Sequence, residues 1–322
     1  MSALPSLQQL KFLAALDEHG HFGRAASAVG VGTPALSTGI AALETMLGLA
    51  LAERSRRRVQ MTPAGKRLAE QARQVLRATH DFLDLARAES RPMAGRWRFG
   101  SIPTIAPFLM PRLLPALKGR FPELQLELKE AKTPELLDEL GAGSLDLLLI
   151  AFPYRTPGCE TMPLFLDSYL FACSPRCPLA RREAIGPDEL LAQPLMLLDP
   201  SNCLHHHALP PLEDAAASPR ATFSGTSLQT LAAMVAVDMG STLLPRLAVE
   251  GGLLRGARVV TRPLAYPGGK RSIGLAWRKG SHRAEHFRRL GQAIQAWALE
   301  AGIGEPLPAG RSRRAGAGRK TR

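Results

Sequence analysis

The chain has 322 residues, which is enough for two or three domains that each bury a core of their own. Its formal net charge of +13 favours a polyanionic partner, either nucleic acid or a membrane surface. The first residues lack a signal-peptide pattern and no stretch has the length of a transmembrane span, so we expect a cytoplasmic protein without a membrane partner. Four unevenly spaced cysteines exclude a disulfide scaffold and a four-thiolate zinc site, and we expect no metal and no cofactor.

Residues 22–65 have the pattern of a helix, a tight turn, a second helix and a basic wing. A first helix over 22–29 ends at a Gly-Val-Gly turn. Thr33-Pro34 is typical of a helix start, and apolar residues then recur at steps of three and four. Because two helices joined by a short glycine turn place the second in the major groove, this segment predicts a winged helix-turn-helix that binds double-stranded promoter DNA.

The predicted DNA contacts divide between the second helix and the rest of this segment. The helix has no Lys or Arg between Thr33 and Gly48, so hydroxyls and a methyl group against thymine must read the base edges. Arginines elsewhere would bind phosphates, which position the protein without specifying sequence. The residues expected at the bases are Thr33, Ala35, Ser37 and Thr38, and those expected at phosphates are Arg24, Arg54, Arg56, Arg57 and Arg58. Pro34, in the first turn of the second helix, is also expected at the DNA. The alternative for the wing arginines is a solvated run of charge that binds no DNA.

A long helix is predicted to start at Thr62-Pro63. Along it, positions four and three residues apart form the narrow seam of a coiled coil. The seam positions are Leu68, Ala72, Val75, Thr79, Phe82 and Ala86. This spacing predicts a homodimer or homotetramer joined through the helix, and the alternative is an amphipathic helix packed on its own chain. The expected boundaries are therefore a DNA-binding domain over 1–62 and a linker helix over 63–90.

Strand and helix patterns alternate from residue 91 to 302 and predict an α/β domain with a mostly parallel sheet. Segment 152–158 has the pattern of a crossover into a second lobe, and 263–269 that of a crossover back. Because the chain would pass from one lobe to the other and back, we expect two lobes with a cleft between them. The last segment, 303–322, is basic with little apolar material, and is predicted to be a disordered tail.

Five short motifs of this domain carry a resemblance to a known family. They are Ser101–Pro111, Glu130–Thr133, Leu195–Asp199, Asn202–Leu204 and Arg271–Gly274. Together with the helix-turn-helix, they make the chain resemble the LysR-type transcriptional regulators and, within that family, the peroxide-sensing OxyR branch. The resemblance implies a winged helix-turn-helix, a linker helix and a two-lobed α/β effector domain like that of periplasmic binding proteins. It also implies a transcriptional activator that works with RNA polymerase and is not an enzyme.

Cys203 is the cysteine whose setting suits a reactive thiol. It follows a predicted buried strand and the loop 199–202, and a helix beginning near it would aim backbone amides at the sulfur and favour the thiolate. Peroxide would convert that thiolate to a sulfenic acid. The resemblance implies that Cys203 is the peroxide-reactive residue and that hydroxyls and a guanidinium line its pocket. The pocket residues expected on this basis are Thr104, Thr133, Asn202 and Arg271.

Two positions depart from the OxyR pattern. Leu212 stands where OxyR proteins place a resolving cysteine, and Asn202 stands where they carry a histidine. Without the customary disulfide, three outcomes stay open: signalling by the sulfenic acid or a mixed disulfide, a different partner thiol, or loss of peroxide sensing. The other thiols are Cys159, Cys173 and Cys177, of which Cys173 is interpreted as a buried hydrophobic residue because it lies in a predicted strand. The histidines at 205–207 are interpreted as a polar helix surface, since they complete no metal site.

Three other functions fit parts of the pattern. A regulator of the same family would respond to a small-molecule coinducer in the cleft, with Cys203 only a wall residue. A thiol peroxidase would use the same cysteine, but the missing resolving thiol argues against turnover. A solute-binding protein would share the two lobes, but the DNA-binding segment argues against it. We therefore expect a DNA-binding regulator whose DNA geometry changes when Cys203 is oxidised.

Overall fold

The computed structural model describes residues 4–54, 59–90, 93–193, 195–198, 224–225, 227–266 and 269–308. The chain divides into two compact units, Met1–Arg91 and Pro92–Arg322. We call them the N-terminal unit and the C-terminal unit, and each is described by itself. Among the described residues no single helix is long and apolar enough to cross a membrane, although the helices Phe22–Ala28 and Thr33–Leu47 together, bent by 101°, reach that length and composition.

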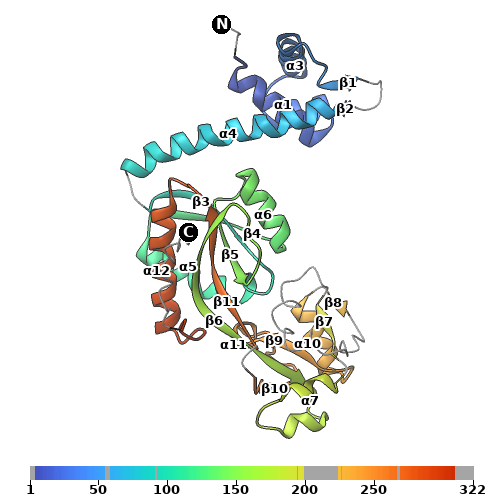
Figure 1. Cartoon of the computed structure of the whole chain (residues 1–322), viewed down its shortest axis with the longest axis vertical. Helices are drawn as coiled ribbons and strands as arrows, with labels where there is room; N and C mark the ends of the chain where they lie inside the picture. Colours follow the sequence, from blue (N-terminus) through green and yellow to red (C-terminus); the bar gives the residue numbers. More distant parts are fainter. Residues whose placement is uncertain are drawn as a thin grey trace, which may run out of the picture. The chain divides into compact units, whose positions relative to one another are not determined.

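The N-terminal unit is a small helical domain with a two-stranded wing (Figure 1). Its elements are α1 (Leu7–His19), α2 (Phe22–Ala28), α3 (Thr33–Leu47), β1 (Ala52–Arg54), β2 (Val59–Met61) and α4 (Pro63–Ser90). Helices α1 and α3 pack closely, because a Cβ added at Gly39 would lie 2.5 Å from the ring of Phe12. Arg73 of α4 pairs with Asp17 of α1 at 3.0 Å. The first half of α4 is therefore fixed to the same core as the helix-turn-helix.

The C-terminal unit alternates strands and helices. Its elements are β3 (Gly95–Ser101), α5 (Ala106–Arg120), β4 (Leu124–Glu130), α6 (Thr133–Ala142), β5 (Leu147–Phe152), β6 (Cys159–Cys173), η1 (Pro178–Arg181), α7 (Pro187–Leu191), β7 (Leu197–Leu198), β8 (Ser224–Gly225), α10 (Leu228–Ala236), β9 (Thr242–Pro245), α11 (Arg246–Glu250), β10 (Val260–Pro263), β11 (Lys270–Arg278) and α12 (Ala284–Glu300). The predicted two-lobed α/β architecture is confirmed.

Strand β6 joins the two lobes (Figure 1). The large sheet has the order β10-β6-β11-β5-β3-β4, and β9 also pairs with β6. The first part of β6 pairs with β11 beside β5, whereas its last residues pair with β9 and β10. In this sheet, only β3 with β4 and β3 with β5 are parallel pairs among the described strands. The expectation of a mostly parallel sheet is therefore wrong, because β6 and β11 cross between the lobes in opposite directions and pair antiparallel.

The C-terminal unit extends beyond the predicted domain end at residue 302. Ile303 is 2% exposed, and the backbone of Glu305 exchanges two 2.8 Å hydrogen bonds with Leu166 of β6. The chain can turn back after α12 because Gly302 and Gly304 adopt positive φ angles of 63° and 70°. The start of the predicted disordered tail is therefore wrong, and residues 309–322 lie outside the described part of the chain.

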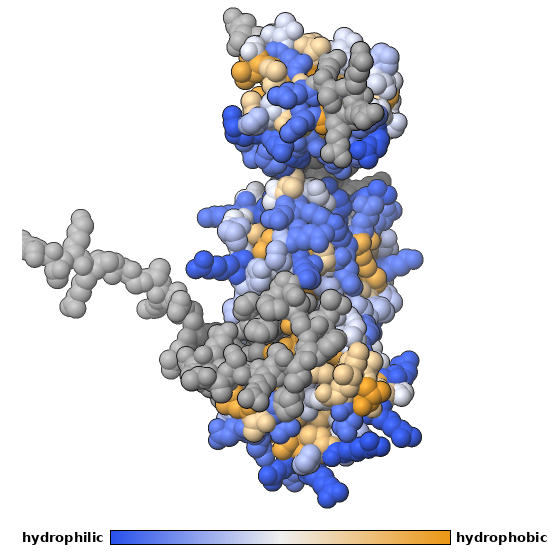
Figure 2. Space-filling model, turned by 90° about the vertical axis from the view of Figure 1, so that its right-hand side faces the viewer, coloured by the Kyte–Doolittle hydropathy of each residue, from blue (hydrophilic) through white to orange (hydrophobic). Residues whose placement is uncertain are grey.

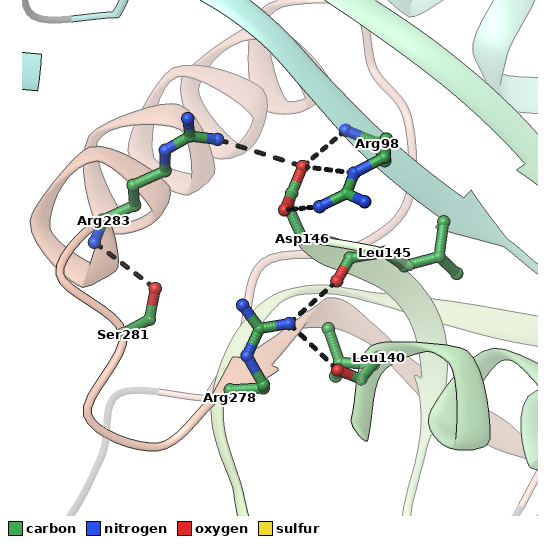
Figure 3. Close-up of polar contacts among 7 residues, drawn as sticks. All are labelled: Arg98, Leu140, Leu145, Asp146, Arg278, Ser281 and Arg283. Carbon is green, nitrogen blue, oxygen red and sulfur yellow. Dashed lines mark hydrogen bonds and ion pairs between the residues drawn. The ribbon is translucent and has the colours of Figure 1, made fainter. Parts of the chain in front are cut away.

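A buried carboxylate joins three elements of the first lobe (Figure 3). Asp146, just before β5, accepts hydrogen bonds of 2.8 Å from the backbone amide and from Nη2 of Arg98 on β3. Arg283, at the start of α12, lies 3.8 Å from the same carboxylate. Arg278 of β11 donates to the carbonyl groups of Leu140 and Leu145, which closes the end of α6. Long-range polar contacts thus fix how α6, β5 and α12 meet.

Asp146→Ala is expected to destabilise the C-terminal unit by about 1–3 kcal/mol, because donors of Arg98 would lose their acceptor and the mostly buried Arg283 would lose its neighbouring carboxylate. Urea unfolding monitored by circular dichroism measures this change. The matched control is Glu127→Ala, which breaks the exposed ion pair of Glu127 with Arg96 and is expected to change stability by less than about 0.5 kcal/mol. Equal effects of the two variants would contradict the role given to Asp146.

Some large apolar side chains of the described residues are exposed. Figure 2 shows hydrophilic residues covering most of the face it draws, with apolar patches between them. In the second lobe, Val237 and Met239 are 68% and 56% exposed. Scattered exposed apolar residues of this kind are normal for a folded protein surface and identify no site by themselves.

Candidate functional site

The helix-turn-helix presents α3 with one buried and one exposed face. Leu36, Ile40 and Leu43 of α3 are buried in the core of the N-terminal unit. Because these residues recur at helical spacing, they leave the opposite face open to solvent. Of the α3 residues expected at DNA, Thr33, Pro34, Ala35 and Thr38 are exposed, while Ser37 is half-buried. These side chains are small and uncharged, so they could contact base edges only through hydroxyl and apolar groups.

Local capping sets the angle of the helix-turn-helix. The Nδ1 atom of His21 accepts from the backbone amide of Gly23 at 3.0 Å and so caps α2. Gly30 ends the helix with φ of 71° and allows the tight turn before α3. Exposed Arg24 donates from Nη2 to the carbonyl oxygen of His19 at 2.7 Å. In the structure, this guanidinium therefore closes the end of α1, which competes with the phosphate contact expected of it.

The wing is a two-stranded antiparallel hairpin in which Ala52 pairs with Met61 and Arg54 with Val59. Strand β1 includes the backbone of Arg54, but its side chain lies outside the described part of the structure. Arg56, Arg57 and Arg58 at the wing tip lie outside it as well. The structure thus supplies the base of the wing, and the phosphate contacts of these four arginines stay predictions.

The predicted seam on α4 divides into two halves. Ala72 is buried and Leu68 packs against the core of the N-terminal unit, so this half serves intrachain packing. Farther along, Val75 is 47% and Phe82 is 71% exposed. Exposed apolar residues at seam spacing are typical of a helix that pairs with a second helix. Among the described seam residues, Val75 and Phe82 are therefore exposed enough to contact a second chain.

One of the residues expected in the effector pocket is a buried arginine. Arg271, near the start of β11, is 1% exposed. Its Nη1 donates to Oγ1 of Thr104 at 2.7 Å, and its Nη2 donates to the Thr104 carbonyl oxygen at 3.1 Å. The structure thus brings together two of the four expected pocket residues, which stand 167 positions apart in sequence.

Thr133 lies in the segment next to that of Thr104. Thr104 follows β3 and Thr133 follows β4, and these strands are adjacent and parallel. The amide of Ala131 donates to the carbonyl oxygen of Ser101 at 3.2 Å, which joins the two segments just after the strands. Because the carboxyl ends of parallel strands form the usual ligand edge of an α/β sheet, buried Thr133 is well placed for the pocket. Asn202 and Cys203 lie outside the described residues.

Asp167 is a site residue that the sequence interpretation missed. Its carboxylate pairs with Nε of Arg271 at 2.9 Å, and both side chains are at most 1% exposed. Burial raises the pKa of Asp167, and the contacts with Arg271 and the Leu247 amide oppose that rise. A single acid inside the apolar run 164–171 was the available signal, because a buried carboxylate requires a partner.

The cysteines within the described residues are free thiols in different settings. Cys173 is fully buried at the end of β6. Burial, together with the nearby thiol of Cys177, raises the pKa of Cys173 to about 12. Burial also raises the pKa of Cys159, at the start of β6. Because the thiolate is the reactive form, Cys173 is a poor partner for an oxidised Cys203.

Cys173 is expected to resist alkylation by iodoacetamide at neutral pH in the folded protein, since its sulfur is buried and protonated. Half-buried Cys177 should be modified faster in the same sample. Peptide mapping by mass spectrometry after timed alkylation measures both rates, and a sample unfolded in guanidinium shows that both peptides are detectable. Equal labelling of the two cysteines in the folded protein would contradict the assignment.

Models of two protein families match the chain. The "Bacterial regulatory helix-turn-helix protein, lysR family" matches residues 7–66, and the "LysR substrate binding domain" matches residues 90–299. The first match covers the helix-turn-helix and wing, and the second covers the two-lobed C-terminal unit. Both halves of the molecule thus point to the same family.

Known relatives and solved structures agree with these matches. The chain is 40% identical over 292 residues to a "Probable hydrogen peroxide-inducible genes activator" of Streptomyces viridosporus, covering 90% of this chain and 94% of that protein. It is 38% identical over 291 residues to the "DNA-binding transcriptional dual regulator OxyR" of Escherichia coli K12, covering 90% and 95%.

Two solved structures share the whole fold. Full-length OxyR of Pseudomonas aeruginosa, with a cysteine replaced by aspartate, gives a TM-score of 0.73 at 31% identity, covering 91% of this chain and 95% of that one. A hydrogen-peroxide-bound cysteine-to-serine mutant of Corynebacterium glutamicum OxyR gives 0.63 at 31% identity, covering 96% and 100%. The chain therefore belongs to the LysR family of transcriptional regulators and to its OxyR branch.

Proposed function

We propose that this protein binds promoter DNA as a homodimer or homotetramer and changes its DNA geometry when hydrogen peroxide oxidises Cys203. The observation that carries the proposal is the contact of buried Arg271 with Thr104 in the effector pocket. A guanidinium and a hydroxyl held together in an apolar interior suit a small polar molecule such as peroxide. The relatives named as peroxide-inducible activators support the same function.

In the proposed reaction, peroxide oxidises the thiolate of Cys203 to a sulfenic acid. The thiolate of Cys203 attacks one peroxide oxygen, the O–O bond breaks, and hydroxide leaves to take up a proton as water. Thr104, Thr133 and Asn202 would orient peroxide through hydrogen bonds, while Arg271 would stabilise the charge on sulfur and on the leaving oxygen. One peroxide is consumed for each sulfenic acid formed. The protein then acts as a sensor and not as an enzyme, in the cytoplasm and without a membrane partner.

The N-terminal unit transmits the change to DNA. Helix α3 would read bases through its small exposed side chains, and the wing arginines would bind phosphates on either side. The exposed second half of the α4 seam would pair two chains, which places two helix-turn-helix units on two half-sites. RNA polymerase is the expected partner of the DNA-bound oligomer.

Footprinting of the purified protein on a DNA site that it selects from a random pool, with and without brief peroxide treatment, tests the function. We expect protection of two half-sites whose extent or spacing changes after oxidation, because two states of the effector domain bias the geometry of the dimer. An unchanged footprint over a range of peroxide concentrations would overturn the proposal. A footprint that shifts only with an added small molecule would instead identify a coinducer-responsive regulator.

A further inference from the structure

The carboxylate of Asp167 holds two groups from different parts of the C-terminal unit. Its Oδ2 accepts from Nε of Arg271 at 2.9 Å, and its Oδ1 accepts from the backbone amide of Leu247 at 2.9 Å. Asp167 lies opposite Arg271 in the antiparallel register of β6 and β11. One buried side chain thus joins β6, β11 and the first turn of α11, where the two lobes meet.

This contact sets the direction of the Arg271 guanidinium. A guanidinium is planar and its donors point in fixed directions, so binding Nε to Asp167 determines where Nη1 and Nη2 can reach. Both reach Thr104, at 2.7 Å to Oγ1 and 3.1 Å to the carbonyl oxygen. The ring of Tyr169 lies 5.7 Å from Cζ of the same guanidinium and limits its movement on another side.

We propose that Asp167 is the positioning residue of the effector pocket: it holds the Arg271 guanidinium against Thr104 in the arrangement that promotes oxidation of Cys203. This inference rests on the proposed function. Asp167 does not meet peroxide itself and acts through Arg271. Its charge also compensates a cation that would be costly to bury alone.

The neighbouring residues on the same strands provide a matched control. Lys270 lies opposite Ser168 in the register and forms an ion pair with Glu305, and Glu305 also accepts from the hydroxyl of Ser168 at 2.6 Å. Because successive residues of a strand point to opposite faces, the side chains of Lys270 and Ser168 lie on the face of the sheet opposite to that of Asp167 and Arg271. Glu305→Gln therefore removes an ion pair at the same level of the strands and leaves the guanidinium in place.

The experiment compares full-length wild type with Asp167→Asn, Arg271→Gln, the double variant and Glu305→Gln. Asparagine keeps an oxygen for the Leu247 amide but removes the charge that binds Nε. The measurement is the rate of Cys203 sulfenic acid formation at limiting peroxide, trapped with a dimedone probe and followed by mass spectrometry. We expect a rate about 10- to 100-fold lower in Asp167→Asn, by analogy with other residues that orient a reacting group. Glu305→Gln should react like wild type.

Two further results separate positioning from a structural role. If Asp167 acts through Arg271, adding Asp167→Asn to Arg271→Gln should lower the rate no further, because the two changes remove one function. Asp167→Glu overfills the buried site but keeps the carboxylate. It should be less stable than wild type in thermal unfolding yet react faster than Asp167→Asn, whereas a structural role would make reactivity follow stability.

The outcomes distinguish this inference from the function on which it rests. A wild-type Cys203 that is inert to peroxide overturns both. A reactive wild type with an Asp167→Asn rate within about twofold, or with additive rate reductions in the double variant, overturns the positioning role alone. If Asp167→Asn does not fold, the double variant takes its place, because it lacks both charges and so buries no charge without a partner. Its rate of Cys203 oxidation is then compared with that of Arg271→Gln. A further fall in rate in that comparison also overturns the positioning role.

Discussion

Cys203→Ser is expected to abolish the peroxide-induced change of the DNA footprint while leaving the footprint of the reduced protein unchanged. Serine keeps nearly the same shape, but its hydroxyl does not attack peroxide at neutral pH as a thiolate does. The reactive sulfur lies in the C-terminal unit of the chain, whereas α3 and the wing belong to the N-terminal unit. The substitution therefore removes the sensing step without touching the groups that bind DNA.

Intact-mass measurement after brief peroxide exposure identifies the product in the wild type. A gain of one oxygen atom indicates sulfenic acid, and a loss of two hydrogen atoms indicates an internal disulfide. With added glutathione, a gain of one glutathione less two hydrogen atoms indicates a mixed disulfide, formed when the sulfenic acid condenses with that thiol and releases water. With Leu212 in place of a resolving cysteine, we expect the sulfenic acid or a mixed disulfide. The fully buried Cys173 should not contribute, so Cys173→Ala serves as the control that leaves the response intact. A response that survives in Cys203→Ser would contradict the assignment of the sensing thiol.

Local signals in the sequence predicted the helix-turn-helix of the N-terminal unit. Helix α3 begins at Thr33, where Thr-Pro predicts a helix start, and its buried face is the one given by Leu36, Ile40 and Leu43. Segments this short are determined by capping, turn residues and periodicity. Periodicity on α4 did not reveal that the first half of the helix packs on the core of its own unit, and the pairing of its second half with another chain stays a prediction.

The central strands of the C-terminal unit were harder to predict. Strand β6 is one strand of 15 residues that joins the two lobes, whereas the crossover into the second lobe was expected at 152–158, before this strand begins. Pro163 interrupts the usual strand pattern, and the pairing with β11 shifts register beside it, between Ile273 and Gly274. A proline in a strand commonly marks an edge or an irregularity, so the sequence alone favours a break at this point.

The contacts of the expected pocket residues could not be predicted from local sequence signals. Thr104 and Arg271 were expected in it only because their motifs resemble those of a known family, and their direct contact spans 167 positions. Asp167 carries no such motif and its partners Arg271 and Leu247 are 104 and 80 positions away. Which buried acid meets which buried base is decided by tertiary packing, and neither periodicity nor local propensity contains that information.

The wing of the N-terminal unit is expected to supply most of the affinity for DNA and most of its salt dependence. Replacing Arg54, Arg56, Arg57 and Arg58 together by alanine should weaken binding to all duplexes alike, because arginines at phosphates act without regard to sequence. For every arginine–phosphate interaction that the substitutions remove, the slope of log K against log salt should become shallower by about 0.9. Fluorescence anisotropy between about 50 and 200 mM salt measures this slope, using one duplex selected from a random pool by the wild type and one scrambled duplex.

Substitutions on α3 should change the sequence preference of DNA binding and not its salt dependence. Thr38 is exposed on the face of α3 that is open to the groove, and no Lys or Arg accompanies it between Thr33 and Gly48. Thr38→Ala should therefore leave the salt slope unchanged and reduce the preference for the selected duplex over the scrambled one, by up to the roughly 1–3 kcal/mol of a good base contact.

Full affinity in the four-arginine variant would show that phosphate binding lies elsewhere on the basic chain. Because the reading helix carries no cation, an unaltered slope in the wing variant would require a source of electrostatic attraction to DNA outside both α3 and the wing.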